Sequence, residues 1–284
     1  MIHAIVRTLA GTLLELNLDA NQRVSDLKAA IGDEWRIPIV CQELVHGFFV
    51  LGNSQYLSDY CFGGSMLSLT LVVSVERVCI DLSSAAPLRQ MHALGILVSL
   101  GARGGDFALN MVRDHLHDAH WRTRRAAVDA FVTLAKRGRH DVVASLVECS
   151  TDAHWVVRRA AVGGLARKAE RGNEEAVVAL IARLRDEDME VQQAALEALE
   201  AVAHRGDQRV IQAVCALFEE SGLGDPRAAQ RIRLAALDTL TKVVQPGDKA
   251  VDTLISRMAD CDPQLESTIL AVLVELKEQV GYCE

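Results

Sequence analysis

The chain has 284 residues, a length that fits one large domain or two ordinary ones. Half of the residues are hydrophobic, and 38 acidic residues against 30 Lys and Arg residues give a formal net charge of −8. Nucleic acid and anionic membranes attract a basic excess, so we expect neither as a partner. No apolar run reaches the roughly 18 residues needed to span a bilayer, and the first residues lack a signal-peptide pattern.

The seven cysteines are widely scattered, and no Cys-x-x-Cys pair occurs. This spacing disfavours a disulfide framework and a structural zinc site. We expect reduced thiols in a cytoplasmic protein, with a nuclear location as the alternative.

The first 80 residues predict a small sheet with one helix. Apolar residues alternate on both sides of Gly11, as in a β-hairpin, and a helical pattern follows with Asn21 as its expected N-cap and Gly32 just past its expected end. The expected order is strand, strand, helix, strand, short strand and strand, over residues 2–6, 14–18, 24–31, 43–46, 48–51 and 67–73.

Three pieces of this segment carry a family resemblance. They are the opening hairpin MIHAIVRTLAGTLLELNL, the pair Ile37-Pro38 and the tetrapeptide Leu57-Ser58-Asp59-Tyr60. The segment resembles ubiquitin over residues 1 to about 73, which implies a β-grasp domain that we assign to residues 1–76. Ubiquitin is conjugated through a terminal Gly-Gly, whereas Val72-Val73-Ser74-Val75 continue this chain. The domain is therefore similar to built-in, non-conjugated ubiquitin-like domains.

The resemblance also implies a binding patch. The family's apolar patch maps onto Leu9, Val45, Ser68 and Thr70, and Phe49 stands where the family has its main chain-building lysine. Paired aromatics in a turn, Phe48-Phe49, cost solubility unless they are covered. Either one of them belongs to the core, or at least one docks on neighbouring helices or on a partner. The resemblance implies docking to ubiquitin-handling or proteasomal proteins, and the alternative is that the domain only caps the rest of the chain.

Residues 83–284 repeat with a period of 34. Residues 153–186 nearly reproduce residues 119–152, and such a period is typical of a helical solenoid. An Arg-Gly pair recurs at the same interval, as at Arg137-Gly138 and Arg103-Gly104, and is expected to end the second helix of each unit. Mostly small residues recur in one column of the aligned repeats, and residues four positions before and after them lie on the same helix face. The column consists of Ala93, Ala127, Ala161, Ala195, Ala236 and Ile269.

The repeat array has an irregular start and one insertion. Ser83-Ser84 before Pro87 predicts a helix start, after a junction strand at residues 76–82. The interval from Gly206 to the next equivalent glycine, Gly247, is seven residues longer than 34, and we place the insertion at residues 219–226. We predict a leading half-repeat without its first helix, then about five helical pairs. The sheet domain or the junction strand should cover the open apolar end.

The turn and second helix of each unit carry a second resemblance. Asp152 precedes the pattern Val157-Arg158-x-x-Ala161-x-x-x-Leu165. This resembles HEAT repeats, most closely the phycobilisome-lyase-type subfamily. The whole chain is then α+β, with an N-terminal β-grasp domain followed by an all-α HEAT-type solenoid. The family implies a structural ladder between repeats, formed here by Asp118, Asp152, Asp186, Asp225, Arg124, Arg158 and Arg233, and lapsing at Gln192 and Glu266.

Candidate chemistry is sparse. Asp114, His115, His117, Asp118 and His120 could supply zinc ligands, but they straddle a helix end and a turn, and His154 repeats His120 at the 34-residue interval without its neighbours. We therefore assign no metal, no cofactor and no catalytic residue, and expect no enzyme. The alternative is a bilin-lyase-like or other HEAT-type enzyme, or a tetrapyrrole chaperone.

One surface remains as a candidate site. The second helices place polar residues beside the small-residue column, where stacked repeats form one extended groove. These residues are Arg122, Arg125, Arg159, Glu190, Gln193 and Arg231. They are either a solvated face or a contact surface for an acidic protein partner. We expect a non-enzymatic scaffold or adaptor that binds protein partners.

Overall fold

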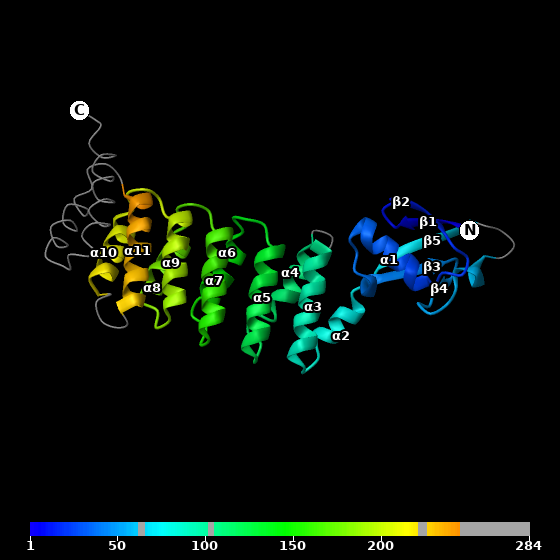
Figure 1. The fold of residues 1–284 in the computed structure, drawn as a ribbon, viewed down its shortest axis with the longest axis horizontal. Coiled ribbons are helices and arrows are strands. Elements are labelled where there is room, and N and C mark those ends of the chain that lie inside the picture. Colours follow the sequence, from blue (N-terminus) through cyan, green and yellow to red (C-terminus); the bar gives the residue numbers. More distant parts are fainter. Residues whose placement is uncertain (62–65, 102–104, 221–225, 245–284) are drawn as a thin grey trace, which may run out of the picture. The chain divides into compact units, whose positions relative to one another are not determined.

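The computed structural model describes residues 1–61, 66–101, 105–220 and 226–244, drawn as ribbon in Figure 1. The chain divides into two compact units, one ending at Asp114 and the other beginning at His115. The predictions for Arg103-Gly104, for Asp225 and for everything from residue 245 onward, which includes the fifth helical pair, lie outside the described residues.

The first unit begins with a five-stranded sheet and a helix in the predicted order. The sheet order is β2-β1-β5-β3-β4; β1 and β5 are parallel, and the other neighbours are antiparallel. The elements are β1 Ile2–Thr8, β2 Leu13–Leu18, α1 Val24–Trp35, β3 Gln42–His46, β4 Phe49–Val50 and β5 Met66–Val73. The alternating apolar residues of β1 and β5 are buried, as are three apolar residues of α1: Ile2, Ala4, Val6, Leu67, Leu69, Leu71, Val24, Leu27 and Ile31. This is the β-grasp arrangement.

The predicted start of α1 at Val24 is confirmed, but its predicted N-cap residue and its predicted end are wrong. The N-cap position belongs to Arg23, whose backbone N–H donates to the Asp26 carboxylate at 2.8 Å, and not to Asn21. The helix continues through Gly32 and ends at Trp35, and the C-cap residue Arg36 is left-handed with φ 53°. A Cβ on Gly32 would lie 3.3 Å from the carbonyl oxygen of Ile37. The glycine therefore serves the close return of the chain after the helix.

The predicted junction strand is a short helix. α2 (Glu76–Leu82) packs against α3 (Pro87–Leu100) and against the 3-10 turn η1 (Ile39–Cys41) of the sheet domain. Its Val78 and Leu82 are buried, four residues apart on one helix face. The leading half-repeat therefore has a short first helix, contrary to the prediction. The predicted start of α3 is confirmed, with Pro87 at its first position. α4 (Gly105–Arg113) is the last helix of this unit.

The second unit is two rows of helices. The first row stacks α5, α7, α9 and α11 side by side, and α6, α8 and α10 form the row behind them (Figure 1). Their bounds are α5 Trp121–Leu134, α6 His140–Cys149, α7 Trp155–Lys168, α8 Glu174–Arg183, α9 Met189–Val202, α10 Gln208–Glu220 and α11 Pro226–Val243. The predicted small-residue column is fully buried in the first row, so neighbouring helices approach closely over Ala127, Ala161, Ala195 and Ala236.

The recurring glycines lie outside the helices. The Arg-Gly pairs were expected at the helix ends, but α5, α7 and α9 end three residues before the arginine, at Leu134, Lys168 and Val202. The glycines have φ +81° and donate their N–H to the end of the next first-row helix. These bonds are Gly138 to the Lys168 carbonyl (2.8 Å), Gly172 to the Val202 carbonyl (2.6 Å) and Gly206 to the Val243 carbonyl (2.7 Å). Each glycine thus fixes the spacing between repeats.

Candidate functional site

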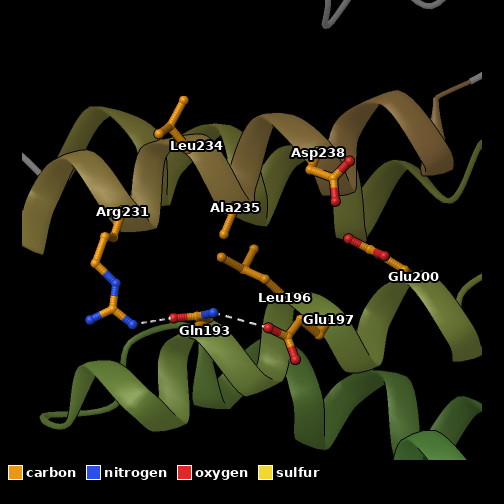
Figure 2. A pocket seen from close by; sticks show the side chains of 8 residues that line it. All are labelled: Gln193, Leu196, Glu197, Glu200, Arg231, Leu234, Ala235 and Asp238. Atoms are coloured by element: carbon orange, nitrogen blue, oxygen red, sulfur yellow. Dashed lines mark hydrogen bonds between the residues drawn. The ribbon is translucent and has the colours of Figure 1, made fainter.

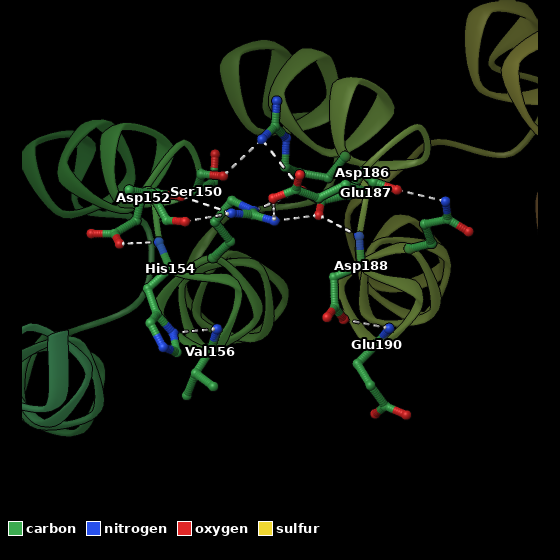
Figure 3. Close-up of polar contacts among 12 residues, drawn as sticks. Ser150, Asp152, His154, Val156, Asp186, Glu187, Asp188 and Glu190 are labelled. Atoms are coloured by element: carbon green, nitrogen blue, oxygen red, sulfur yellow. Dashed lines mark hydrogen bonds and ion pairs between the residues drawn. The ribbon is translucent and has the colours of Figure 1, made fainter.

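The turns between paired helices carry the predicted ladder (Figure 3). The Arg158 guanidinium donates to both carboxylate oxygens of Asp186, at 2.8 and 2.7 Å, and to the carbonyl oxygens of Asp152 and Ala153. One repeat earlier, the Arg124 guanidinium donates to both carboxylate oxygens of Asp152, at 2.6 and 2.8 Å. The Arg158 and Asp186 side chains are only 6% and 2% exposed. Two rungs of the predicted ladder, Arg124–Asp152 and Arg158–Asp186, are therefore confirmed, and their role is to hold repeats together.

The first predicted lapse of the ladder is at Gln192, whereas the second, at Glu266, lies outside the described residues. Gln192 replaces the arginine in the next repeat, and its side-chain amide donates to the Asp186 carbonyl at 2.7 Å. A neutral amide loses the paired, charge-assisted bonds that an arginine fork supplies. The contact between α9 and α11 therefore lacks the arginine fork that ties α7 to the following repeat.

The hydrogen-bond partners of the ladder residues favour the charged forms of Arg124, Arg158 and Asp152. The hydrogen bond to Asp152 raises the pKa of Arg124, and the hydrogen bond to Asp186 raises the pKa of Arg158. Burial acts to raise the pKa of Asp152, but the bonds from Arg124 and from the His154 backbone outweigh it, so the pKa lies below its ordinary value. Burial raises the pKa of the nearby Cys149 to about 12, which leaves this thiol unreactive.

The histidines of the turns cap helices. The Asp152 carboxylate accepts the His154 N–H at 2.7 Å, and His154 Nδ1 accepts the Val156 N–H at 3.3 Å. Asp118 and His120 repeat this arrangement at α5. The His154 ring also stacks on Trp121, with ring centroids 4.0 Å apart. Across the described ranges, no three His, Cys, Asp or Glu side chains form a group that could hold a metal ion.

The six residues that were predicted to line a groove lie on α5, α7, α9 and α11. We call the side of these helices that carries them the four-helix face. The six residues are Arg122, Arg125, Arg159, Glu190, Gln193 and Arg231. Four of them come together: Arg159 lies 3.9 Å from Glu190, and Arg231 lies 3.4 Å from Glu190 and 2.7 Å from Gln193. The other two are held within α5. Arg125 pairs with Asp129 at 3.0 Å, and the Arg122 guanidinium lies over the Trp121 ring at 5.3 Å. The arginines of this face therefore already have acidic or aromatic neighbours.

Between α9 and α11 the four-helix face is hollowed by a groove of about 380 Å³, which we call the acidic groove (Figure 2). It is lined by Gln193, Leu196, Glu197, Glu200, Arg231, Leu234, Ala235 and Asp238. Only Gln193 and Arg231 were predicted from the sequence. The others continue the same helical spacing from these two, so extending the series by three and seven residues would have found Leu196, Glu200, Leu234 and Asp238.

The open face of the sheet brings part of the ubiquitin-like patch together. Val45 is the register partner of Thr70 on β5 and of Val50 on β4, so these three side chains share one face. Ser68 lies on the same face two residues from Thr70, and Leu9 is exposed just past the end of β1. Val50 is exposed and was missed, although the alternation through Val45 points to it.

Phe48 and Phe49 are 100% and 73% exposed. The alternative that places one of them in the core is therefore wrong. Phe49 pairs with His46 at the edge of the sheet. Two exposed aromatic rings, one in the turn before β4 and one on this edge strand, mark a surface that a partner could cover.

Comparison with known proteins agrees with both parts of the fold. Residues 88–166 and 143–230 match the HEAT repeat family, and together these matches cover half of the chain. The chain is also similar to Ubiquitin-like protein 4A of Rhinolophus ferrumequinum, with 28% identity over 151 residues that cover 50% of this chain and 94% of the relative. Within the described residues, no helix is both long and apolar enough to cross a membrane. The chain belongs to the HEAT-repeat family and carries an N-terminal ubiquitin-like domain.

Proposed function

We propose that this protein is a non-enzymatic scaffold or adaptor that binds a protein partner on its four-helix face. The observation that carries the proposal is the row of exposed polar residues that runs across neighbouring repeats through Arg159, Glu190, Gln193 and Arg231. Stacked repeats use such extended surfaces to bind other proteins. The buried ladder ties α5, α7 and α9 together, so this part of the surface is pre-organised for a partner, which lowers the cost of binding.

The ubiquitin-like domain is proposed to dock to ubiquitin-handling or proteasomal proteins. The support is the cluster of Val45, Val50 and Thr70 on the open sheet face, with exposed Leu9 nearby. The alternative role is to cover the start of the solenoid, and it is supported by the packing of α2 on both η1 and α3. A Val45→Ala change separates the two roles, because it should weaken receptor binding without loosening α2.

The test is affinity purification with mass spectrometry of the wild type and two variants. Arg125→Glu/Arg159→Glu should lose partners of the four-helix face, and Val45→Ala should lose ubiquitin-related partners. Arg167→Glu is the matched control, since it is an exposed arginine of α7 whose guanidinium donates to the Gly163 carbonyl of its own helix. An unchanged partner list in both variants would refute the proposal. A visible absorption band after incubation with a bilin or haem would instead support the tetrapyrrole alternative.

A further inference from the structure

The acidic groove has an apolar floor and charged walls. Leu196 of α9 is fully buried beneath it, and Ala235 and the 43%-exposed Leu234 come from α11. Figure 2 shows Arg231 at one end and Glu200 and Asp238 at the other, with the leucines between them. An apolar strip between polar ends suits a short segment that presents a hydrophobic side chain flanked by charges.

Among the described residues, carboxylates outnumber cations in the acidic groove and in its ion pairs. Glu190 is shared by Arg231 at 3.4 Å and Arg159 at 3.9 Å, and Lys242 lies 2.7 Å from both Glu200 and Asp238. Because Lys242 carries one positive charge and Glu200 and Asp238 carry two negative charges, this cluster has one negative charge in excess. Glu197 adds another, since it is exposed and accepts a hydrogen bond from the neutral Gln193 amide at 3.0 Å.

The carboxylates of α9 are not repeated on the neighbouring helix α7. One repeat earlier, the positions of Glu197 and Glu200 are occupied by Gly163 and Ala166 on α7. The contact between α5 and α7 instead carries Arg125 and Arg159. The four-helix face thus changes from basic at α5 to acidic at α9 and α11, so its two ends would attract partner segments of opposite charge.

We propose that the acidic groove binds a protein segment in which Lys or Arg residues flank a large aliphatic side chain. The aliphatic side chain would cover Leu196 and Leu234, and the cations would face Glu197 and the Glu200–Asp238 pair. This inference rests on the proposed function and names the chemistry of the partner at one end of the four-helix face. Charge complementarity sets both the specificity and the salt dependence of such contacts.

The experiment selects peptides from a phage-displayed random 12-residue library on the full chain. The enriched sequences should place Lys or Arg beside Leu, Ile or Phe. A fluorescein-labelled peptide KLLKKLLK should bind the wild type, more weakly at higher salt, and its twin ELLEELLE should not. Glu197→Lys should weaken binding of KLLKKLLK by about tenfold or more, which is the size expected for a close charge pair at an interface.

The matched control is Asp129→Lys, which makes the same change of charge in the same column two repeats earlier. It should leave binding of KLLKKLLK within about twofold of the wild type, allowing for long-range charge effects that salt screens. Enrichment of acidic peptides, no enrichment, or equal losses in Glu197→Lys and Asp129→Lys would each overturn the inference. So would a chain dimer that Glu197→Lys converts to a monomer in sedimentation, because the groove would then be a self-contact. The proposed function would still stand if Arg125→Glu/Arg159→Glu lost its partners.

Discussion

Replacing Arg158 by methionine tests whether the ladder stabilises the stack. Methionine keeps most of the side-chain length but removes the charge and all donors. Asp186 would then be left 2% exposed without its bidentate partner, with only the longer contact to Arg183 at 3.5 Å as an ion pair among the described residues, and the Asp152 and Ala153 carbonyls would each lose a donor. Removing one member of a buried pair costs about 3–5 kcal/mol, because the remaining charge stays desolvated.

The neighbouring Arg159→Met is the control. Arg159 is 54% exposed, and its nearest acidic oxygen, on Glu190, is 3.9 Å away, so its loss should cost only about 0.5 kcal/mol. Urea unfolding followed by circular dichroism at 222 nm gives both values from the midpoint and slope. Arg158→Met/Asp186→Asn should recover at least about 1 kcal/mol of the loss, since the stranded charge is gone and the asparagine oxygen can still accept the Asp188 N–H. A loss of less than about 1 kcal/mol for Arg158→Met, or one equal to that of Arg159→Met, would refute this reasoning.

Three further predictions concern the turns and the helices. Gly172→Ala should destabilise the protein by about 1–3 kcal/mol, because φ is +81° and a Cβ would collide with the His204 ring, whereas Gly163→Ala inside α7 has open space and should be neutral or stabilise by up to about 1 kcal/mol. Asp188→Ala removes the acceptor for the Glu190 N–H at the start of α9 and should cost about 1 kcal/mol, measured by the same urea series. The pKa of Asp152 is lowered in the folded protein. The ionised carboxylate therefore makes its full contribution to the free energy of unfolding above the ordinary pKa of 3.8, and this contribution is lost as the pH falls through the pKa of the folded protein. The unfolding free energy of Asp152→Asn should therefore fall less steeply below pH 3.8 than that of the wild type.

Each of these has a contrary result. Equal stability of the two glycine variants would mean that the left-handed turn is not required. An unchanged midpoint for Asp188→Ala would mean that water replaces the cap without loss. Parallel pH curves for the wild type and Asp152→Asn would show that the carboxylate has the same pKa in the folded and unfolded chains.

Repetition explains why much of the solenoid could be predicted from the sequence. In a stacked array every repeat makes the same contacts with its neighbour, so a contact appears as a column with a fixed period. The alanine column, the aspartates of the turns and Arg124 and Arg158 were all visible in this way. The same holds for the sheet domain, where alternation through Leu67, Leu69 and Leu71 reports one buried face.

Predictions that depended on a single local signal were less successful. Asn21 and Gly32 have the residue types expected at helix ends, but the return of the chain past Ile37 decided where α1 stops. Residues 76–82 alternate like a strand, yet burial of Val78 and Leu82 against neighbouring helices makes them helical. In both cases packing against distant parts of the chain outweighed a local preference of about 1 kcal/mol or less.

The sequence by itself determined the two-part architecture, the repeat period and the ladder, because these follow from patterns repeated along the chain. Only the tertiary structure decided which side chains face each other across neighbouring helices. It paired Arg231 with Glu190 and Gln193, and it brought Glu200 and Asp238 to one end of a groove. That choice depends on the spacing and rotation of α11 against α9, which follow an insertion that breaks the period. A contact that is not repeated from one unit to the next leaves no periodic pattern in the sequence, so aligning the repeats could not predict it.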